Sequence, residues 1–327
     1  GEKMEDEVIR IVEEYLDGDF SAFDGADIPF ASGKAIGRTV DYVSGRNRYI
    51  GHLISLATCS YKGLRVGLDG ANGSAFSIAR SVFDALGAKT FVIGDCPNGE
   101  NVNENVGSTK CEALQRLVRE NSLDIGFAFD GDADRCIAVD ERGEVVTGDE
   151  EMYILARYLK DRNLLAGDRL VCTVLSNGGL IKGLKAAGIC CALCDVGDKN
   201  VWDAMAKHGA VLGGERSGHI VFSKYETTGD GLLTAIMLME AVVEKKQALS
   251  KLLRGYKSLP QTAISVPVTD KTAAMEGVLK LAEKLERELD VRIIARPSGT
   301  EREVRVMAEG KSEEGCALAC KLLCARI

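Results

Sequence analysis

The segment IGFAFDGDADRCIAV, residues 125–139, places two short apolar runs on either side of a loop with three aspartates and an arginine. Each run has the length and composition of a buried strand. Alternate residues of an extended loop face the same side, so the carboxylates of Asp130, Asp132 and Asp134 can converge on one point. Their mutual repulsion needs a cation to offset it. Oxygen ligands of this kind suit magnesium or manganese, so the segment predicts a divalent metal site after a buried strand.

Strands and helices alternate on both sides of this segment, which favours an α/β layer architecture followed by a smaller α+β unit. The expected strands are 65–69, 90–93, 125–129, 136–139, 169–175, 189–196, 210–213, 263–266, 291–295 and 303–309. The expected helices include 111–121, 150–160, 178–188, 199–208, 229–244 and 272–289. Residues 18–48 are polar and weakly periodic, and we expect them to form a connection.

Composition narrows the class of protein. The 327 residues are 46% hydrophobic and 28% charged, as in soluble globular proteins, and no apolar run is long enough to cross a bilayer. The 49 acidic and 41 basic residues give a net charge of −8, which argues against a broad nucleic-acid surface. Eleven cysteines without an even framework suggest a reducing compartment, and we expect the cytoplasm. The CxxC at Cys191–Cys194 lies in an expected strand and has no second pair, which favours buried thiols over zinc.

Two other interpretations of the acidic loop remain open. An EF-hand would use Asp130, Asp132, Asp134 and Glu141, but Arg135 occupies the position that requires glycine. A phosphatase of the haloacid dehalogenase type also has two aspartates after a buried strand, but its further acids and lysine are not evident. Arg135 beside the carboxylates instead indicates an anion shared between metal and guanidinium, as in phosphoryl transfer.

Two further loops follow expected strands. GGERSGH, residues 213–219, combines glycines with side chains that can hydrogen-bond to hydroxyl groups. RPSGTE, residues 296–301, combines an arginine, a glycine and two hydroxyls, which predicts a phosphate-binding loop that Arg305 on the next strand can reach. On spacing alone, each loop could also be a polar turn.

In this order the three loops resemble those of the α-D-phosphohexomutase superfamily: a DGDxDR magnesium loop, a GExSG sugar loop and an RxSGTE phosphate loop. The strings NVNENVGST at 101–109, GERSGH at 214–219 and TTGDG at 227–231 look most like the phosphoglucosamine mutase family. The resemblance runs from about Glu2 to Ile327. It implies interconversion of glucosamine 6-phosphate and glucosamine 1-phosphate through a phosphoserine and a bisphosphate intermediate.

The resemblance also implies roles for individual residues. Asp130, Asp132 and Asp134 would bind Mg²⁺, and Arg135 would steady the transferring phosphoryl group as the catalytic residue. The implied substrate-binding residues are Lys199, Glu215, Ser217, His219, Arg296, Ser298, Gly299, Thr300 and Arg305. The expected partner is a small-molecule phosphosugar, with no nucleic acid and no membrane, and a homodimer stays open.

The implied fold has two mixed-sheet α/β domains and a C-terminal α+β domain. The expected division is 1–48 as a remnant of a first domain and linker, 49–147 with the metal loop, 148–257 with the sugar loop, and 258–327 with the phosphate loop.

Three departures qualify the resemblance. Lys199 stands where arginine is usual, and Arg302 replaces the proline usual after SGTE. The sequence contains no Ser-His-Asn type of nucleophile loop, so we expect this chain alone to bind phosphosugar without isomerising it. A phosphoglucomutase or phosphomannomutase, and a non-catalytic phosphosugar-binding fragment, are the alternatives.

Overall fold

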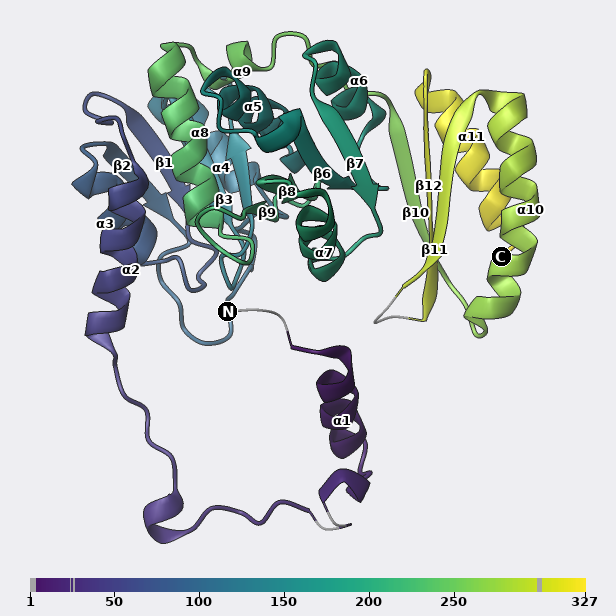
Figure 1. Ribbon diagram of the computed structural model, residues 1–327, viewed down its shortest axis with the longest axis horizontal. Helices are drawn as coiled ribbons and strands as arrows, with labels where there is room; N and C mark the ends of the chain where they lie inside the picture. The colour runs from purple at the N-terminus through teal and green to yellow at the C-terminus, as the bar shows by residue number, and fades with distance from the viewer. Residues whose placement is uncertain (1–3, 24, 26, 299–301) are drawn as a thin grey trace.

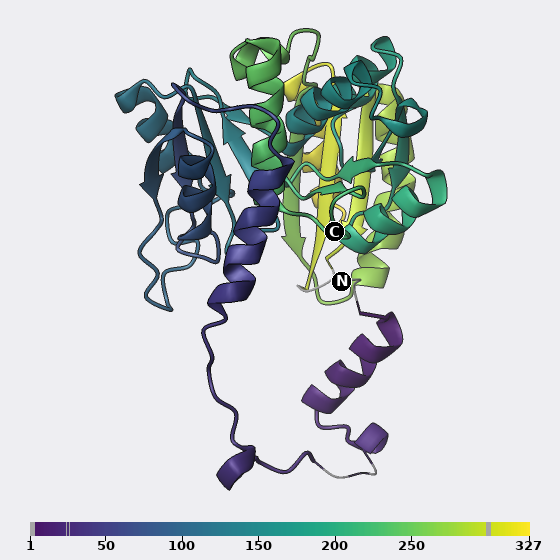
Figure 2. The ribbon, with the colours of Figure 1, turned by 60° about the vertical axis from the view of Figure 1, so that its left-hand side comes forward.

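The computed structural model describes residues 4–23, 25, 27–298 and 302–327, and these residues form three sheets with flanking helices (Figure 1). The first helix, α1 (Asp6–Leu16), lies apart from the sheets. A long connection with two short 3-10 turns, η1 (Ser21–Phe23) and η2 (Gly33–Ala35), leads from it to α2 (Val43–Leu56), as Figure 2 also shows.

The first sheet has the strand order β2-β1-β3-β4-β5. The strand β1 pairs in parallel with β2 and β3, whereas β4 pairs antiparallel with β3 and β5. Its elements are β1 (Arg65–Asp69), α3 (Ile78–Ala85), β2 (Lys89–Ile93), α4 (Glu112–Asn121), β3 (Ile125–Phe129), β4 (Cys136–Val139) and β5 (Val145–Val146). The central strand β3 is buried along its whole length, as its apolar sequence predicts.

The second sheet repeats this arrangement with the order β7-β6-β8-β9, in which only β9 is antiparallel. Its elements are α5 (Gly148–Asp161), η3 (Ala166–Asp168), β6 (Arg169–Thr173), α6 (Gly178–Ala186), β7 (Cys190–Cys194), α7 (Asp198–His208), β8 (Leu212–Gly214), β9 (Ile220–Phe222), α8 (Gly231–Lys245) and α9 (Leu249–Leu252). The short strand β9 was not expected from the sequence, because three residues are too few to show a period.

The C-terminal sheet is antiparallel, with the order β10-β12-β11. It consists of β10 (Gln261–Pro267), β11 (Val291–Pro297) and β12 (Glu303–Gly310), covered by α10 (Lys271–Leu289) and α11 (Glu313–Cys324). Val278, Val304 and Cys320 belong to a core of its own. This unit matches the expected α+β architecture.

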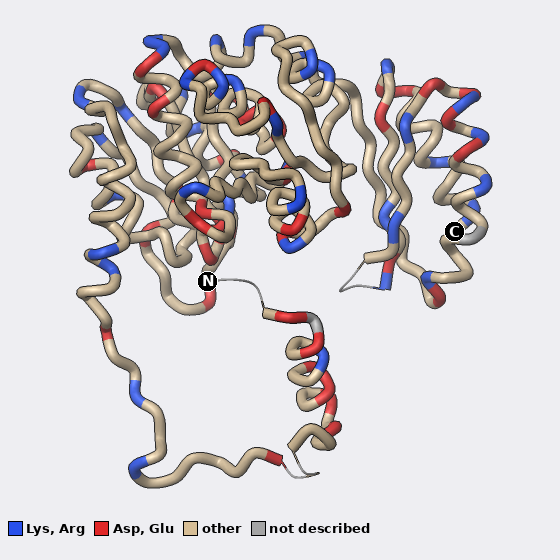
Figure 3. Tube along the Cα trace, in the orientation of Figure 1, with Lys and Arg blue, Asp and Glu red and all other residues tan. Residues whose placement is uncertain are grey.

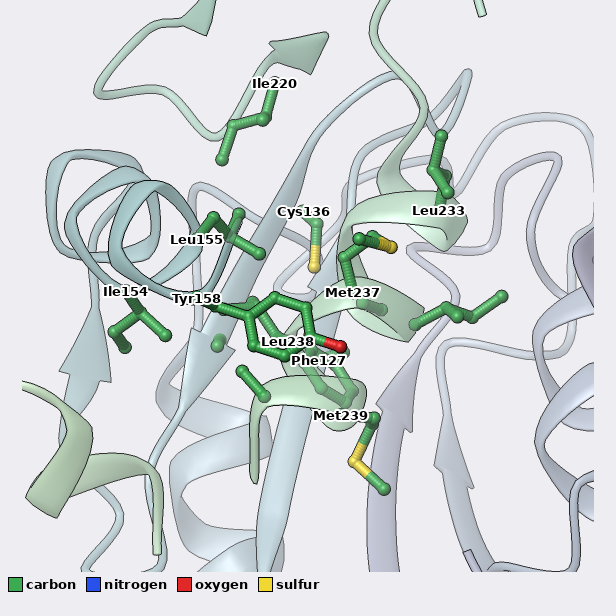
Figure 4. Packing of buried hydrophobic residues seen from close by; sticks show 14 of the residues in the cluster. Phe127, Cys136, Ile154, Leu155, Tyr158, Ile220, Leu233, Met237, Leu238 and Met239 are labelled. Atoms are coloured by element: carbon green, nitrogen blue, oxygen red, sulfur yellow. The ribbon is translucent and has the colours of Figure 1, made fainter. Parts of the chain in front are cut away.

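The first two sheets share one continuous hydrophobic core. Figure 4 shows Phe127 and Cys136 of the first sheet beside Leu155 of α5 and Met237 of α8. Glu240 of α8 is only 1% exposed, and it accepts hydrogen bonds from the Thr58 amide at 2.9 Å and the Tyr61 hydroxyl at 3.2 Å. These contacts fix α8, which belongs to the second unit, against the first unit.

The expectation that residues 18–48 form a connection is wrong for its last part, because α2 begins at Val43. Residues 43–48 in its first half are mostly polar, whereas Tyr49, Ile50, Leu53 and Ile54 in its second half belong to or pack against the core, so only the second half carries an apolar face. None of the helices in the described part of the chain is both long and apolar enough to cross a bilayer.

Candidate functional site

The three aspartates of the acidic loop converge as predicted. The loop joins β3 to β4, which pair with Phe129 opposite Cys136. One carboxylate oxygen from each of Asp130, Asp132 and Asp134 lies within 4.8 Å of the others. Asp130 and Asp134 are partly buried, and Asp132 is exposed. The arrangement offers three oxygen ligands on one side and leaves the other side open to a ligand.

Neighbouring elements hold the loop in this shape. The Gly231 amide at the start of α8 donates to the Ala133 carbonyl at 2.9 Å, and the Ser74 amide donates to the Gly131 carbonyl at 2.8 Å. A side chain at Gly231 would lie 2.4 Å from the Arg135 carbonyl oxygen, so only glycine allows this approach. The loop is therefore fixed by both α/β units.

The electrostatics of the loop favour a cation. Burial and the neighbouring Asp134 carboxylate raise the pKa of Asp130 to about 6. The Arg135 Nε atom lies 3.6 Å from Asp130 Oδ2 and 3.6 Å from Asp134 Oδ1, too far for a hydrogen bond. Among the described residues, the buried Asp134 Oδ1 atom has no hydrogen-bond partner. A divalent ion would satisfy this oxygen and reduce the repulsion, so the residues present fit a magnesium ion.

His219 lies behind the acidic loop, in contact with Asp134. Its side chain is buried, with the residue 2% exposed, and Nδ1 lies 3.1 Å from Asp134 Oδ2. Burial would raise the pKa of Asp134, but the hydrogen bond and charge of His219, together with the Arg135 charge and a hydrogen bond with Asp130, outweigh it, so the pKa is lowered. The buried ring behind Asp134 supports the acidic loop, and the expected contact of His219 with the substrate stays a prediction.

Glu215 and Ser217 lie in the turn between β8 and β9. The Gly218 amide donates to the Glu215 carbonyl at 3.0 Å and closes the turn. Glu215 Oε1 accepts from the Gly197 amide at 2.9 Å, and the Ser217 hydroxyl donates to Glu215 Oε2 at 3.4 Å. Because Gly197 precedes α7, this contact brings the turn beside the half-buried Lys199 in the first turn of that helix.

Arg296 and Arg305 are direct neighbours across the C-terminal sheet, where β11 and β12 pair with these two residues opposite each other. Arg305 Nε lies 2.6 Å from Glu303 Oε1. Ser298 is 4% exposed, and its carbonyl accepts from Lys271 Nζ at 2.6 Å. Gly299 and Thr300 lie outside the described residues.

A cavity of about 340 Å³ lies beside these arginines and reaches the second α/β unit. Arg296, Arg305 and Gln261 line it from the C-terminal unit, and Leu175 and Arg216 line it from the second unit. The sequence analysis did not single out Arg216. Its place between Glu215 and Ser217, inside a loop expected to face a ligand, was the available signal. Figure 3 shows Lys and Arg residues on the C-terminal strands.

Three family models cover most of the chain. The α/β/α domain II of phosphoglucomutase/phosphomannomutase matches residues 47–143, domain III matches 147–259, and the C-terminal domain matches 264–319. The phosphohexomutase resemblance and the multi-domain α/β fold class are thereby confirmed.

Solved structures share this fold. A phosphoglucomutase/phosphomannomutase family protein from Burkholderia thailandensis superposes with a TM-score of 0.74 at 22% identity, covering 98% of this chain and 69% of that chain. An Aspergillus fumigatus N-acetylphosphoglucosamine mutase, solved in complex with GlcNAc-6P and magnesium, has a TM-score of 0.71 at 19% identity, covering 85% of this chain and 68% of that chain. At these identities the likeness establishes the fold alone.

Curated relatives are much closer in sequence. The phosphoglucosamine mutases of Lachnospira eligens and Lachnoclostridium phytofermentans are each 52% identical over 320 residues. That of Geobacillus thermodenitrificans is 43% identical over 320 residues. In all three cases the match covers 97% of this chain and 70% of the relative. The chain therefore belongs to the phosphoglucosamine mutase family.

Proposed function

We propose that this chain supplies the metal, sugar and phosphate sites of a magnesium-dependent phosphosugar mutase that interconverts glucosamine 6-phosphate and glucosamine 1-phosphate. The observation that carries the proposal is the convergence of three carboxylate oxygens within 4.8 Å, in a loop fixed by two α/β units. Membership of the phosphoglucosamine mutase family supports the amino-sugar substrate. All eleven cysteines are free thiols, which fits a reducing compartment such as the cytoplasm.

The proposed metal ligands are Asp130, Asp132 and Asp134. A bound magnesium ion would supply positive charge to a transferring phosphoryl group. The Arg135 side chain is 43% exposed and lies beside two of these carboxylates. Its guanidinium can therefore hydrogen-bond to oxygens of the phosphoryl group that the magnesium ion would contact. Arg135 would therefore stabilise charge and needs no change of protonation.

The proposed substrate contacts divide into two groups. Glu215 and Ser217, with Lys199 beside them, would orient sugar hydroxyls. Arg296 and Arg305 would hold the phosphate that does not react, together with Ser298, Gly299 and Thr300. A fixed phosphate end leaves the other end of the sugar to face the acidic loop, which is the positioning that this reaction requires.

We further propose the division expected from the sequence, with the first boundary moved to the start of α2 at Val43: a connection before it, α/β units up to 147 and at 148–257, and the phosphate-binding unit at 258–327. The family-model boundaries at 143, 147, 259 and 264 lie near these positions.

Calorimetry tests the metal site. We expect weak magnesium binding that Asp132→Asn abolishes, because the amide removes one anionic ligand. Unchanged binding in this variant would refute the assignment. The reaction is tested by a coupled mutase assay on the product of the complete gene, with glucosamine, glucose and mannose phosphates compared. Release of inorganic phosphate without isomerisation would instead identify a phosphatase.

A further inference from the structure

The cavity beside the C-terminal arginines contains a concentration of positive charge. Three guanidinium groups line it, from Arg216, Arg296 and Arg305, and no carboxylate lines it among the described residues. Arg296 and Arg305 face each other across β11 and β12. Like charges directly opposite each other destabilise a sheet. The Glu303 carboxylate, 2.6 Å from Arg305 Nε, offsets part of this charge. Because the cavity is still lined by three guanidinium groups, its lining suits an anion.

The backbone of Arg216 is held independently of its side chain. The Gly148 amide donates to the Arg216 carbonyl at 3.1 Å, within the turn that the Gly218 amide closes. The residue is nevertheless exposed. In the described part of the chain, no carboxylate lies within ion-pair distance of its guanidinium. The turn therefore presents a charged group to the cavity without committing it to a protein partner.

We propose that Arg216 is a third phosphate-binding residue, which holds the substrate's phosphate dianion from the side opposite Arg296 and Arg305. This inference rests on the proposed phosphate site and extends it to the second α/β unit. The planar guanidinium can make two parallel hydrogen bonds to phosphate oxygens. Because Arg216 stands between Glu215 and Ser217, the residue that binds phosphate would share one turn with the residues that orient the sugar.

The consequence is a site that is complete only when the two units face each other. A phosphate bound by Arg296 alone would leave the sugar free to swing, whereas a phosphate bound from both units fixes the distance to Glu215. Arg216 is therefore a positioning and specificity residue for phosphorylated ligands.

A purely structural role for Arg216 makes a different prediction. Burial raises the pKa of Asp149, and the Arg216 charge acts against this rise. Asp149 Oδ1 is buried and has no hydrogen-bond partner among the described residues. If Arg216 served only to balance Asp149, its removal would lower thermal stability and would weaken all ligands equally.

The test measures binding by calorimetry, with glucosamine 6-phosphate and glucosamine as the two probes. We expect Arg216→Ala to weaken glucosamine 6-phosphate binding roughly tenfold, the effect of one charge-assisted hydrogen bond, and to leave glucosamine unchanged. Arg216→Lys should recover part of the loss, because lysine keeps the charge but not the fork. Arg80→Ala is the charge-matched control, since Arg80 is exposed on α3 and paired with Asp84 at 3.6 Å. Inorganic phosphate should compete with glucosamine 6-phosphate in the unaltered chain and require a correspondingly higher concentration in Arg216→Ala.

Arg296→Ala separates the outcomes. If it weakens glucosamine 6-phosphate by roughly 10- to 100-fold and Arg216→Ala has no effect, the inference is wrong and the phosphate site stands. If neither variant has an effect, the proposed phosphate site is wrong as well. A lowered melting temperature in Arg216→Ala, with equal loss for both probes, would assign Arg216 to Asp149 and overturn the inference.

Discussion

Replacing His219 by alanine will weaken magnesium binding by this chain roughly 10- to 100-fold. The imidazole is buried, and its Nδ1 atom lies 3.1 Å from Asp134 Oδ2. The other oxygen of the same carboxylate, Oδ1, is a buried atom without a hydrogen-bond partner among the described residues. His219 thus fixes one oxygen of Asp134 and leaves the other for the ion. Without the ring, the carboxylate can rotate away from Asp130 and Asp132.

The magnitude follows from the type of bond. A hydrogen bond to a charged group contributes about 1.5–3 kcal/mol, and about 1.4 kcal/mol corresponds to a tenfold change in affinity. Asp134 keeps 26% of its side chain exposed, so water compensates for part of the loss. His219→Asn should retain most of the affinity, because an amide nitrogen can replace Nδ1 as the donor.

The assay is magnesium calorimetry, with circular dichroism to confirm that each variant is folded. His52→Ala is the matched control, since it removes a histidine whose Nε2 atom lies 3.1 Å from a carboxylate oxygen of Glu226, which is not among the proposed metal ligands. Magnesium affinity in folded His219→Ala equal to that of the unaltered chain would refute the reasoning, because Asp134 would then not depend on His219.

Three further predictions concern the same region and its support. Gly229→Ala should weaken magnesium binding in the same direction as His219→Ala, because a Cβ atom there would lie 2.5 Å from the His219 ring; calorimetry of both variants together checks this. Magnesium affinity should fall about tenfold for each pH unit below 6, because the pKa of Asp130 is about 6 and the ion requires the deprotonated carboxylate. A magnesium affinity that does not change between pH 7 and pH 5 would contradict the assignment of Asp130 as a ligand. Glu240→Ala should lower the free energy of unfolding by about 3 kcal/mol, because the buried Tyr61 hydroxyl and the amides of residues 58 and 59 lose their common acceptor. Glu244→Ala one turn later, with 38% of its side chain exposed, should cost less than about 1 kcal/mol; urea denaturation of both variants checks this.

Features that depend on residues close together in the chain could be predicted from the sequence alone. The apolar runs at 125–129 and 136–139 fixed two strands, and the loop between them could only place its aspartates at the end of a sheet. The alternation of strands and helices determined the layer architecture, and three loops in one order indicated the superfamily. These patterns involve residues close together in the chain, so they predict the elements without knowledge of what packs against each element. The first half of the helix α2 was not predicted, because residues 43–48 are mostly polar and show no apolar period.

Only the tertiary structure decided which distant residues meet. His219 lies 85 positions from Asp134 in the chain, and its burial behind that carboxylate depends on how β8 and β9 pack against the first unit. The two α/β units share a common core around α5 and α8, and the sequence of neither helix predicts this contact. The pairing of Arg296 with Arg305 follows from the register of β11 and β12, and the approach of Arg216 to both follows from the contact between two units. Apolar periodicity reports which face of an element is buried, but not which partner covers it, and the chemistry of this site depends on the partners.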